Sequence, residues 1–295
     1  IKPLTVRRTR TDIENVARYN KDVNGFPKVE RPIENRYELN ERLANLFESA
    51  METLDKKLSY ARYQAIAYLK PEAANGLYDN AELISRSLAG IRKNGLVKRL
   101  ESSFYAFQIS LNNFRQANQN MIDMFNRDKV FIAPDLDINN LLEAGLSDEE
   151  IEEKLNAKAE ENPKNSVFKA EEFDPEYIEL LQQDQEILEK LYKDWEGITD
   201  EDDSKFAKFN KLLKHELFKV ERNPEQKLVV FSESVDTVKY LERRINRKDV
   251  LVISADNRSK LFKTIRENFD ANYKTKLNKY NIILTTDVLA EGVNL

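Results

Sequence analysis

The chain has 295 residues, 41% of them hydrophobic and 34% charged, with a formal net charge of −5 at pH 7. This is too apolar for a disordered chain, and only 7 Gly and 8 Pro argue against an all-β protein rich in turns. The lack of cysteine excludes disulfides and thiolate metal sites, and a lone histidine, His215, leaves a zinc site almost without ligands. No apolar run approaches the ~20 residues of a membrane span, and nothing resembles a signal peptide. We therefore expect a cytoplasmic protein with no membrane partner.

The first part of the chain predicts a linker followed by a long helix. Residues 1–36 combine an apolar and basic stretch with a loop that contains several turn-forming residues. From Tyr37 to Leu69 apolar residues recur every three or four positions, and Pro71 then ends the pattern. Because this spacing is that of the buried face of an amphipathic helix, we expect one continuous helix over this range.

Two more helical stretches are predicted before residue 130. The first covers about 80–88, and we expect Gly90 and Gly95 to frame a break after it. These glycines have the spacing of a phosphate loop, but Leu96 and Val97 stand where Lys and Ser or Thr are required, so that motif is excluded. The next stretch carries an apolar stripe, which we interpret as core: Leu96, Leu100, Phe104, Phe107, Leu111, Phe114, Met121 and Phe125.

An acidic segment follows over 147–176, with eleven acidic residues against four lysines. Its net charge of −7 leaves +2 for the rest of the chain, so the overall charge does not exclude a nucleic-acid partner. We interpret its DEEIEE run as an exposed helix face and not as a metal site, and His215 as structural or solvated. Asp174-Pro175 predicts the start of another helix, which Gly197 ends.

The pattern changes at about Gln226. The apolar runs LVVF, DVLVI and NIIL alternate with the amphipathic stretches VDTVKYLERRI and SKLFKTIRENFD. Strands that alternate with helices of this length predict βαβ units and a parallel sheet. The predicted fold is therefore α/β with a large all-α region: a linker over 1–36, a helical domain over 37–222 and a partial parallel sheet over 223–295. Three strands bury little by themselves, so we expect an incomplete sheet and an excised fragment of a longer protein.

Small polar residues follow each predicted strand, at 232–234 (Ser-Glu-Ser), 254–256 (Ser-Ala-Asp) and 285–287 (Thr-Thr-Asp). Ligands of open α/β sheets bind at the carboxyl ends of the strands, so these turns predict a phosphate or nucleotide crevice. The alternative is that Ser, Thr and Asp only cap the helices that follow.

Together these residues carry a family resemblance. LVVFSES, ISADNRSKLFKTIRENFD and IILTTDVLAEGVNL resemble, in order and spacing, the second RecA-like lobe of superfamily 2 helicases, from motif IV to motif V. The SWI/SNF-type branch in its bacterial form is the most similar. LTVRRTRTDI, FPKVERPIENRYEL, GLVKRLESSFYAF and SKFAKFNKLL are similar to stretches that leave the first lobe, follow it, or precede the second in that branch. The resemblance implies a P-loop NTPase-like lobe.

Five residues are implied to contact nucleic acid. Thr286 would meet the nucleic-acid backbone, and Asp287 would organise the motif V turn. Phe231 and Ser232 belong to motif IV, and Arg258 lies in the helix start that faces the nucleic acid. The implied partner is double-stranded DNA.

The implied nucleotide residues lie at the other side of motif V. Glu291, Gly292 and Asn294 would approach the nucleotide sugar or the opposing lobe, where the glycine would allow close backbone approach. Motif VI, the phosphate loop and the metal-binding acids of the family are absent from the sequence, so we expect no catalytic and no metal-binding residue here. ATP and Mg²⁺ would be cofactors of the parent protein, with its first helicase lobe as a further partner, and the fragment alone would be inactive.

Two alternatives stay open. The chain could be a non-enzymatic helical scaffold that carries a small nucleotide-sensing α/β module. The basic residues of the first hundred positions could touch a duplex, although a solvated face is the simpler interpretation: Arg7, Arg8, Arg42, Arg62, Arg86, Arg92 and Arg99.

Overall fold

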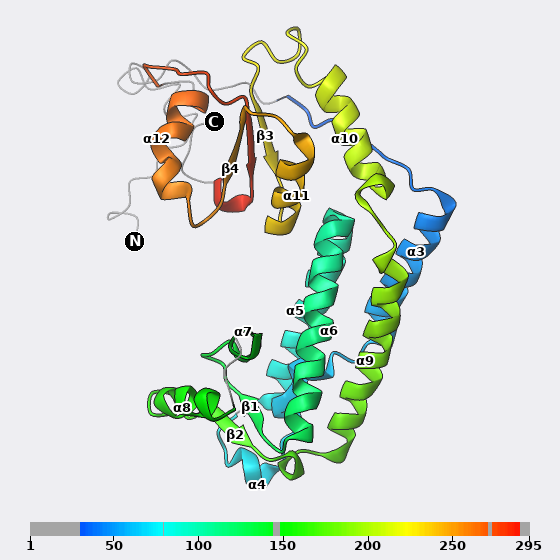
Figure 1. The fold of residues 1–295 in the computed structure, drawn as a ribbon, viewed down its shortest axis with the longest axis vertical. Helices are drawn as coiled ribbons and strands as arrows, with labels where there is room; N and C mark the ends of the chain where they lie inside the picture. Colours follow the sequence, from blue (N-terminus) through cyan, green and yellow to red (C-terminus); the bar gives the residue numbers. More distant parts are fainter. Residues whose placement is uncertain (1–29, 79, 144–147, 271–272, 290–295) are drawn as a thin grey trace, which may run out of the picture. The chain divides into compact units, whose positions relative to one another are not determined.

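The computed structural model describes residues 30–289, apart from residue 79 and the segments 144–147 and 271–272 (Figure 1). The chain forms two compact units. Of the described residues, the helical unit comprises those of Leu39–Asp203, and the sheet unit comprises those of 204–289 together with 30–38. The sheet unit thus begins before residue 223, the boundary expected from the sequence. Each unit is described by itself.

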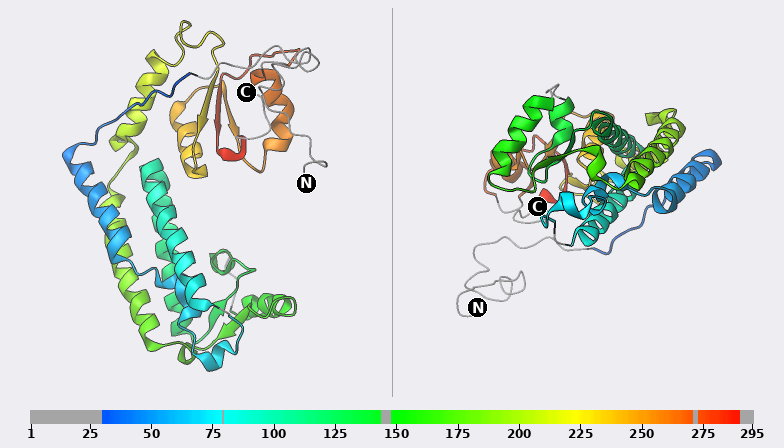
Figure 2. Two further views of the ribbon diagram at one scale, coloured as in Figure 1. Left: turned by 180° about the vertical axis from the view of Figure 1, so that it is seen from behind. Right: turned by 90° about the horizontal axis from the view of Figure 1, so that it is seen from below.

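The helical unit is built on three long helices that pack lengthwise: α5 (Ala81–Ser102), α6 (Phe104–Asn126) and α9 (Pro175–Glu196) (Figures 1 and 2). Its other elements, in chain order, are α3 (Glu41–Glu52), η2 (Thr53–Lys57), η3 (Ala61–Ala67), α4 (Pro71–Ala74), β1 (Val130–Ile132), α7 (Ile138–Glu143), α8 (Asp148–Ala159), β2 (Ser166–Phe168), η4 (Ala170–Glu172) and η5 (Asp200–Asp202).

The aromatic stripe predicted as core is confirmed. Phe107 and Phe114 are fully buried, and the rings of Phe104 and Phe107 meet Trp195 edge-on at centroid distances of 5.2 and 4.9 Å. Such edge-to-face pairs contribute about 0.5–1.5 kcal/mol beyond the apolar area they bury. The predicted start of α9 is also confirmed, because the Asp174 side chain accepts a hydrogen bond from the Glu176 N–H at 3.0 Å.

The prediction of one continuous helix from Tyr37 to Leu69 is wrong. α3 passes into the π-helical turn η2, and the chain then leaves the helix at Leu58. Tyr60 adopts the left-handed conformation, with φ +57°, and the 3₁₀ helix η3 follows. The break has a remote cause. The carboxylate of Asp184 on α9 accepts hydrogen bonds from the backbone N–H groups of Ser59 and Ala61, which a continuous helix would have used internally.

The break predicted around Gly90 and Gly95 is wrong as well. Both glycines lie inside α5, which runs without interruption to Ser102. Glycine lowers helix stability by about 1 kcal/mol relative to alanine, a small cost beside the burial of Leu96 and Leu100 against the core.

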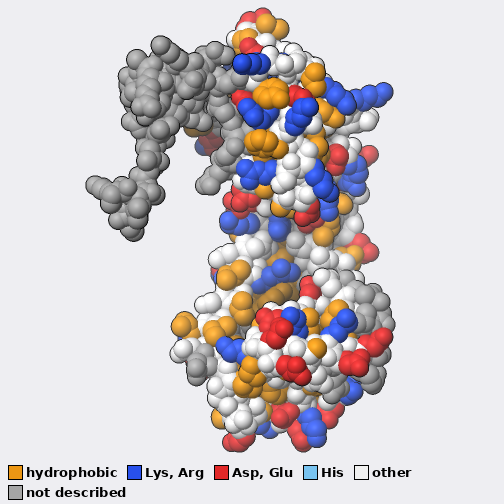
Figure 3. All heavy atoms as spheres, turned by 90° about the vertical axis from the view of Figure 1, so that its left-hand side faces the viewer, with side chains coloured by type: hydrophobic (Ala, Val, Ile, Leu, Met, Phe, Trp, Pro, Cys, Tyr) orange, Lys and Arg blue, Asp and Glu red, His pale blue; other side chains and the backbone are white. Residues whose placement is uncertain are grey.

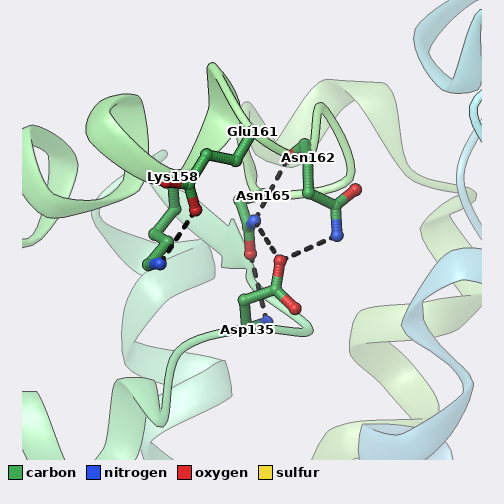
Figure 4. A network of polar contacts seen from close by, with 5 residues as sticks. All are labelled: Asp135, Lys158, Glu161, Asn162 and Asn165. Carbon is green, nitrogen blue, oxygen red and sulfur yellow. Dashed lines mark hydrogen bonds and ion pairs between the residues drawn. The ribbon is translucent and has the colours of Figure 1, made fainter.

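A small antiparallel ladder, β1 with β2, was not predicted from the sequence. A polar network connects the segment after β1 with the turn before β2 (Figure 4). One carboxylate oxygen of Asp135 accepts hydrogen bonds from the side-chain amides of Asn162 and Asn165 at 2.7 and 2.8 Å, and the Asp135 N–H donates to Asn165 Oδ1. These bonds hold the pKa of the Asp135 carboxyl below its usual range.

The sheet unit contains α10 (Ser204–His215), β3 (Leu228–Phe231), α11 (Val235–Ile245), β4 (Val250–Ile253), α12 (Arg258–Phe269), β5 (Ile282–Thr285) and the 3₁₀ turn η6 (Asp287–Leu289). The mixed α/β architecture with a parallel sheet is confirmed. The strands pair in the order β3-β5-β4, so the strand that comes third in the chain lies between the other two. Helices α11 and α12 cover opposite faces of this sheet (Figures 1 and 2).

Candidate nucleic-acid interface

The carboxyl ends of the three parallel strands coincide at one edge of the sheet. Phe231 pairs with Thr285, and Thr285 pairs with Ile253, so the last residues of β3, β5 and β4 lie side by side. The polar turns that follow the strands therefore leave the sheet at the same edge. We call this edge, with residues 231–234, 254–258 and 286–287, the carboxyl edge. The register brings the predicted turns together at the edge where ligands of open α/β sheets bind.

The central strand positions the turn predicted to contact nucleic acid. All four residues of β5 have no exposed surface, because both faces of the strand are covered. Thr286 is buried, with 9% of its surface exposed, whereas Asp287 is exposed at the start of η6. The Leu289 N–H reaches the Thr286 carbonyl at 3.4 Å, so Thr286 occupies the capping position and Asp287 does not. The side chain of Asp287 thus lies at the surface of the carboxyl edge.

The turn after β3 is coupled to the central strand. The Ser232 N–H donates to the Thr285 carbonyl at 3.0 Å, which extends the parallel ladder past the end of β3. Ser234 caps α11, since its hydroxyl accepts from the Thr237 N–H at 3.2 Å. The alternative of simple helix capping therefore holds for Ser234. Phe231, by contrast, is 52% exposed at the end of β3, so its aromatic ring is only partly removed from water.

The turn after β4 is organised by a residue that the sequence analysis did not select. Asn257 Oδ1 accepts from the Ser254 N–H at 2.8 Å, and Asn257 Nδ2 donates to the Val252 carbonyl at 3.1 Å. These two bonds fix the direction in which α12 begins, and Arg258 is the first residue of that helix. Asn in a turn is an ordinary sequence signal for this kind of backbone bonding, and it could have identified Asn257.

The other predicted residues fall into two groups. Glu291, Gly292 and Asn294 lie outside the residues that the structure describes, as do Arg7 and Arg8. Within the helical unit, Arg62 donates to the Ala117 carbonyl at 2.9 Å and lies against the Tyr63 ring, with Arg92 on the same ring. For these two arginines the solvated-face interpretation is wrong, because they pack on aromatic side chains.

The two units differ in charge. Residues 204–295 contain 19 Lys and Arg against 12 Asp and Glu, a net charge of +7, whereas residues 39–203 contain 19 against 34, a net charge of −15. Electrostatic attraction of a polyanion is therefore concentrated in the sheet unit. The acidic total of the whole chain arises in the helical unit, where Figure 3 shows Asp and Glu side chains among Lys and Arg on the face in view.

The described residues were compared with the requirements of a metal site and of a membrane-spanning helix. Between residues 30 and 289, outside the undescribed positions, no three His, Cys, Asp or Glu side chains gather closely enough to hold a metal ion. In the same residues no helix is long and apolar enough to cross a membrane.

Comparison with known families finds one similarity, in the sheet unit. Residues 204–295 match the family described as helicase conserved C-terminal domain. This part of the chain is thus similar to the C-terminal domain of helicases. No curated protein matches the chain.

Proposed function

We propose that the chain is part of an ATP-dependent DNA helicase or translocase of the SWI/SNF type, in its bacterial form. The observation that carries the proposal is the carboxyl edge, where three strand ends in register present small polar residues within a lobe of the helicase type and of net charge +7. Thr286, Asp287, Ser232, Phe231 and Arg258 are the residues proposed to face the nucleic-acid backbone.

In this proposal the parent protein hydrolyses ATP with Mg²⁺ between two lobes and moves along duplex DNA. Residues 204–295 supply one wall of the nucleotide site, through Glu291, Gly292 and Asn294, and the parent's first lobe supplies the phosphate loop. Phosphoryl transfer of this kind depends on positioning and charge stabilisation, so one wall alone does not catalyse it. The helical unit, with its charge of −15, is proposed to contribute little to DNA affinity.

DNA binding by the 295-residue chain tests the proposal. Two fluorescein-labelled duplexes of unrelated sequence are titrated with protein, and fluorescence anisotropy is recorded from about 50 to 200 mM salt. We expect weak binding that is the same for both sequences and that falls steeply as salt rises, because lysines and arginines displace counterions from phosphates. No binding at low salt, or an affinity that does not change with salt concentration, would overturn the proposal.

A further inference from the structure

A second basic surface lies away from the carboxyl edge. The loop between α12 and β5 reads YKTKLNKYN over 273–281, and its three lysines, Lys274, Lys276 and Lys279, are exposed. The sequence contains no acidic residue between Asp270 and Asp287. Three positive charges within six positions favour anions near this loop, although Lys276 Nζ also lies 3.9 Å from a carboxylate oxygen of Glu225.

The loop is held in place by a buried side chain. Asn268, 2% exposed near the end of α12, accepts hydrogen bonds at Oδ1 from the N–H groups of Lys279 and Tyr280, at 2.7 and 3.0 Å. Its amide donates to the Thr264 carbonyl at 2.8 Å, and the Leu277 N–H donates to the Glu267 carbonyl at 2.9 Å. The lysines are therefore presented from a fixed backbone.

The same charge continues along the outer face of α12. Lys260 and Lys263 are exposed, and Phe262 between them is 42% exposed. Arg266 lies 4.8 Å from the centroid of the Tyr273 ring, which joins the helix to the loop. Figure 3 shows this side of the sheet unit, where Lys and Arg side chains lie around hydrophobic ones. Basic residues interleaved with aromatic ones are typical of surfaces that bind nucleic acid.

Lys227, just before β3, binds the end of this loop. Its Nζ donates to the Tyr280 carbonyl at 2.7 Å and to Asn281 Oδ1 at 3.1 Å. Burial, and then the neighbouring charge of Lys276, hold the pKa of Lys227 below its ordinary value, although Asp249 and Glu225 act in the opposite direction. These bonds also place the loop at the edge where the strands begin, opposite the carboxyl edge.

We propose that Lys260, Lys263, Lys274, Lys276 and Lys279, together called the lysine surface, form a second contact with the phosphate backbone of duplex DNA. The proposal rests on the proposed function, since it assumes a DNA-binding lobe. The twelve residues of α12 span about 18 Å, and duplex DNA carries about ten phosphates over that length. In this proposal a duplex follows α12 from its start at the carboxyl edge to the loop at its end, along the five exposed lysines.

The test compares two triple variants of the whole chain with the wild type. In the loop variant, Lys274, Lys276 and Lys279 are changed to Gln. In the control variant, Lys208, Lys211 and Lys214 are changed to Gln; these exposed lysines lie on α10 of the same unit. Both variants lose three positive charges. The probe is a labelled duplex of about 30 base pairs, and the slope of log affinity against log salt is measured.

Each phosphate contact contributes about 0.9 to the slope, so three lost contacts lower it by about 2.7 in the loop variant. Between about 50 and 200 mM salt, the affinity of the wild type should then fall about 40-fold further than that of the loop variant. The control variant should keep a slope close to that of the wild type. Circular dichroism checks that both variants fold.

The measurements distinguish a failure of the proposed function from a failure of the lysine surface. If the wild type does not bind duplex DNA, the proposed function and the lysine surface are both overturned. If the wild type binds with a steep salt dependence but the loop variant keeps its slope, only the lysine surface is overturned. Equal loss of slope in the two variants would show a diffuse charge effect and would also overturn it.

Discussion

The carboxylate of Asp184 accepts hydrogen bonds from both the backbone N–H and the hydroxyl of Ser59, at 2.8 and 2.9 Å, across 125 residues of sequence. The same carboxylate accepts from the Ala61 N–H at 3.0 Å, and only 1% of Asp184 is exposed. Asp184 thus provides the hydrogen bonds that the chain loses where it leaves the helix. Its removal takes the acceptor away from the N–H and hydroxyl of Ser59 and leaves the Ala61 N–H with its 3.2 Å bond to Ser59 Oγ.

We expect Asp184→Ala to lower the free energy of unfolding of the helical unit by about 3 kcal/mol, since each buried group left without a partner costs about 1–3 kcal/mol. Urea unfolding followed by fluorescence measures this, because Trp195 is the only tryptophan of the chain and lies in the core of that unit. Asp194→Ala, at an exposed position of the same helix, serves as the control and should change stability by less than about 0.5 kcal/mol. Equal effects would contradict the role assigned to Asp184.

Stability should also depend on pH through this residue. Burial raises the pKa of the Asp184 carboxyl above its ordinary 3.8, although the hydrogen bonds from Ser59 and Ala61 oppose the shift. The folded state therefore binds this proton more tightly than the unfolded state, and the free energy of unfolding falls as pH rises from 3.8 through the raised pKa. Asp184→Asn should lack that part of the slope. Urea titrations of both proteins at several pH values from about 4 to 7 compare the slopes, and identical curves would refute the prediction.

Substitution of glycine by alanine should change stability in opposite directions in α5 and at Gly76. A Cβ added at Gly90 or Gly95 meets nothing within 4 Å, so Ala should fit and stabilise the helix by about 0.5–1 kcal/mol at each position. Gly76 has equal space but a φ of +70°, which strains an L-residue, and Gly76→Ala should destabilise by about 1 kcal/mol. The three variants are compared by urea unfolding. Loss of stability in Gly90→Ala would mean that α5 bends there.

The turn after β5 should matter more for coupling than for folding. In the proposed parent protein, Thr286→Ala with Asp287→Ala should reduce DNA-stimulated ATP turnover strongly. The same change should cost about 1–2 kcal/mol of stability, the value of a lost cap or hydrogen bond, because the packing resides in Ile282–Leu284. Melting temperature and turnover are measured on one preparation. A variant that melts early but keeps full DNA stimulation would rule out the assignment.

The 295-residue chain by itself should not turn over ATP. The sequence contains no Gly-x₄-Gly-Lys-Ser/Thr phosphate loop, which would hold the phosphates. Phosphate release is followed at steady state with and without duplex DNA, and we expect background values in both. DNA-stimulated turnover that persists across independent preparations would disprove this prediction.

The sheet could be predicted from the sequence because its signals are local. Each strand is a short apolar run between a helix and a polar turn. The ends of α9 are likewise marked in the sequence, by Asp174-Pro175 at the start and Gly197 at the end. The elements that were missed depend on distant partners. Nothing near Ser59 indicates that a carboxylate 125 residues away will replace its helical hydrogen bonds.

In the candidate site, too, the local features could be predicted and the features that depend on distant partners could not. The polar turns were recognised one by one, but their register, with Phe231 and Ile253 on either side of Thr285, is a property of the strand order. Asn257 was overlooked because its role is to bond its own backbone. The lysine surface was not predicted either, since it requires Asn268 to fold the loop onto the end of α12.

The strand order also determines when the sheet can form during synthesis. β3 and β4 each pair with β5, so neither can complete its ladder until Ile282–Thr285 has left the ribosome. Leu228 pairs with Ile282, so the ladder between β3 and β5 joins residues that are far apart in the sequence. Closing the loop between them costs chain entropy before the contacts of the ladder offset that cost. Meanwhile the apolar strands remain open to wrong pairing. The sheet can therefore assume its native order only after its central strand has been synthesised.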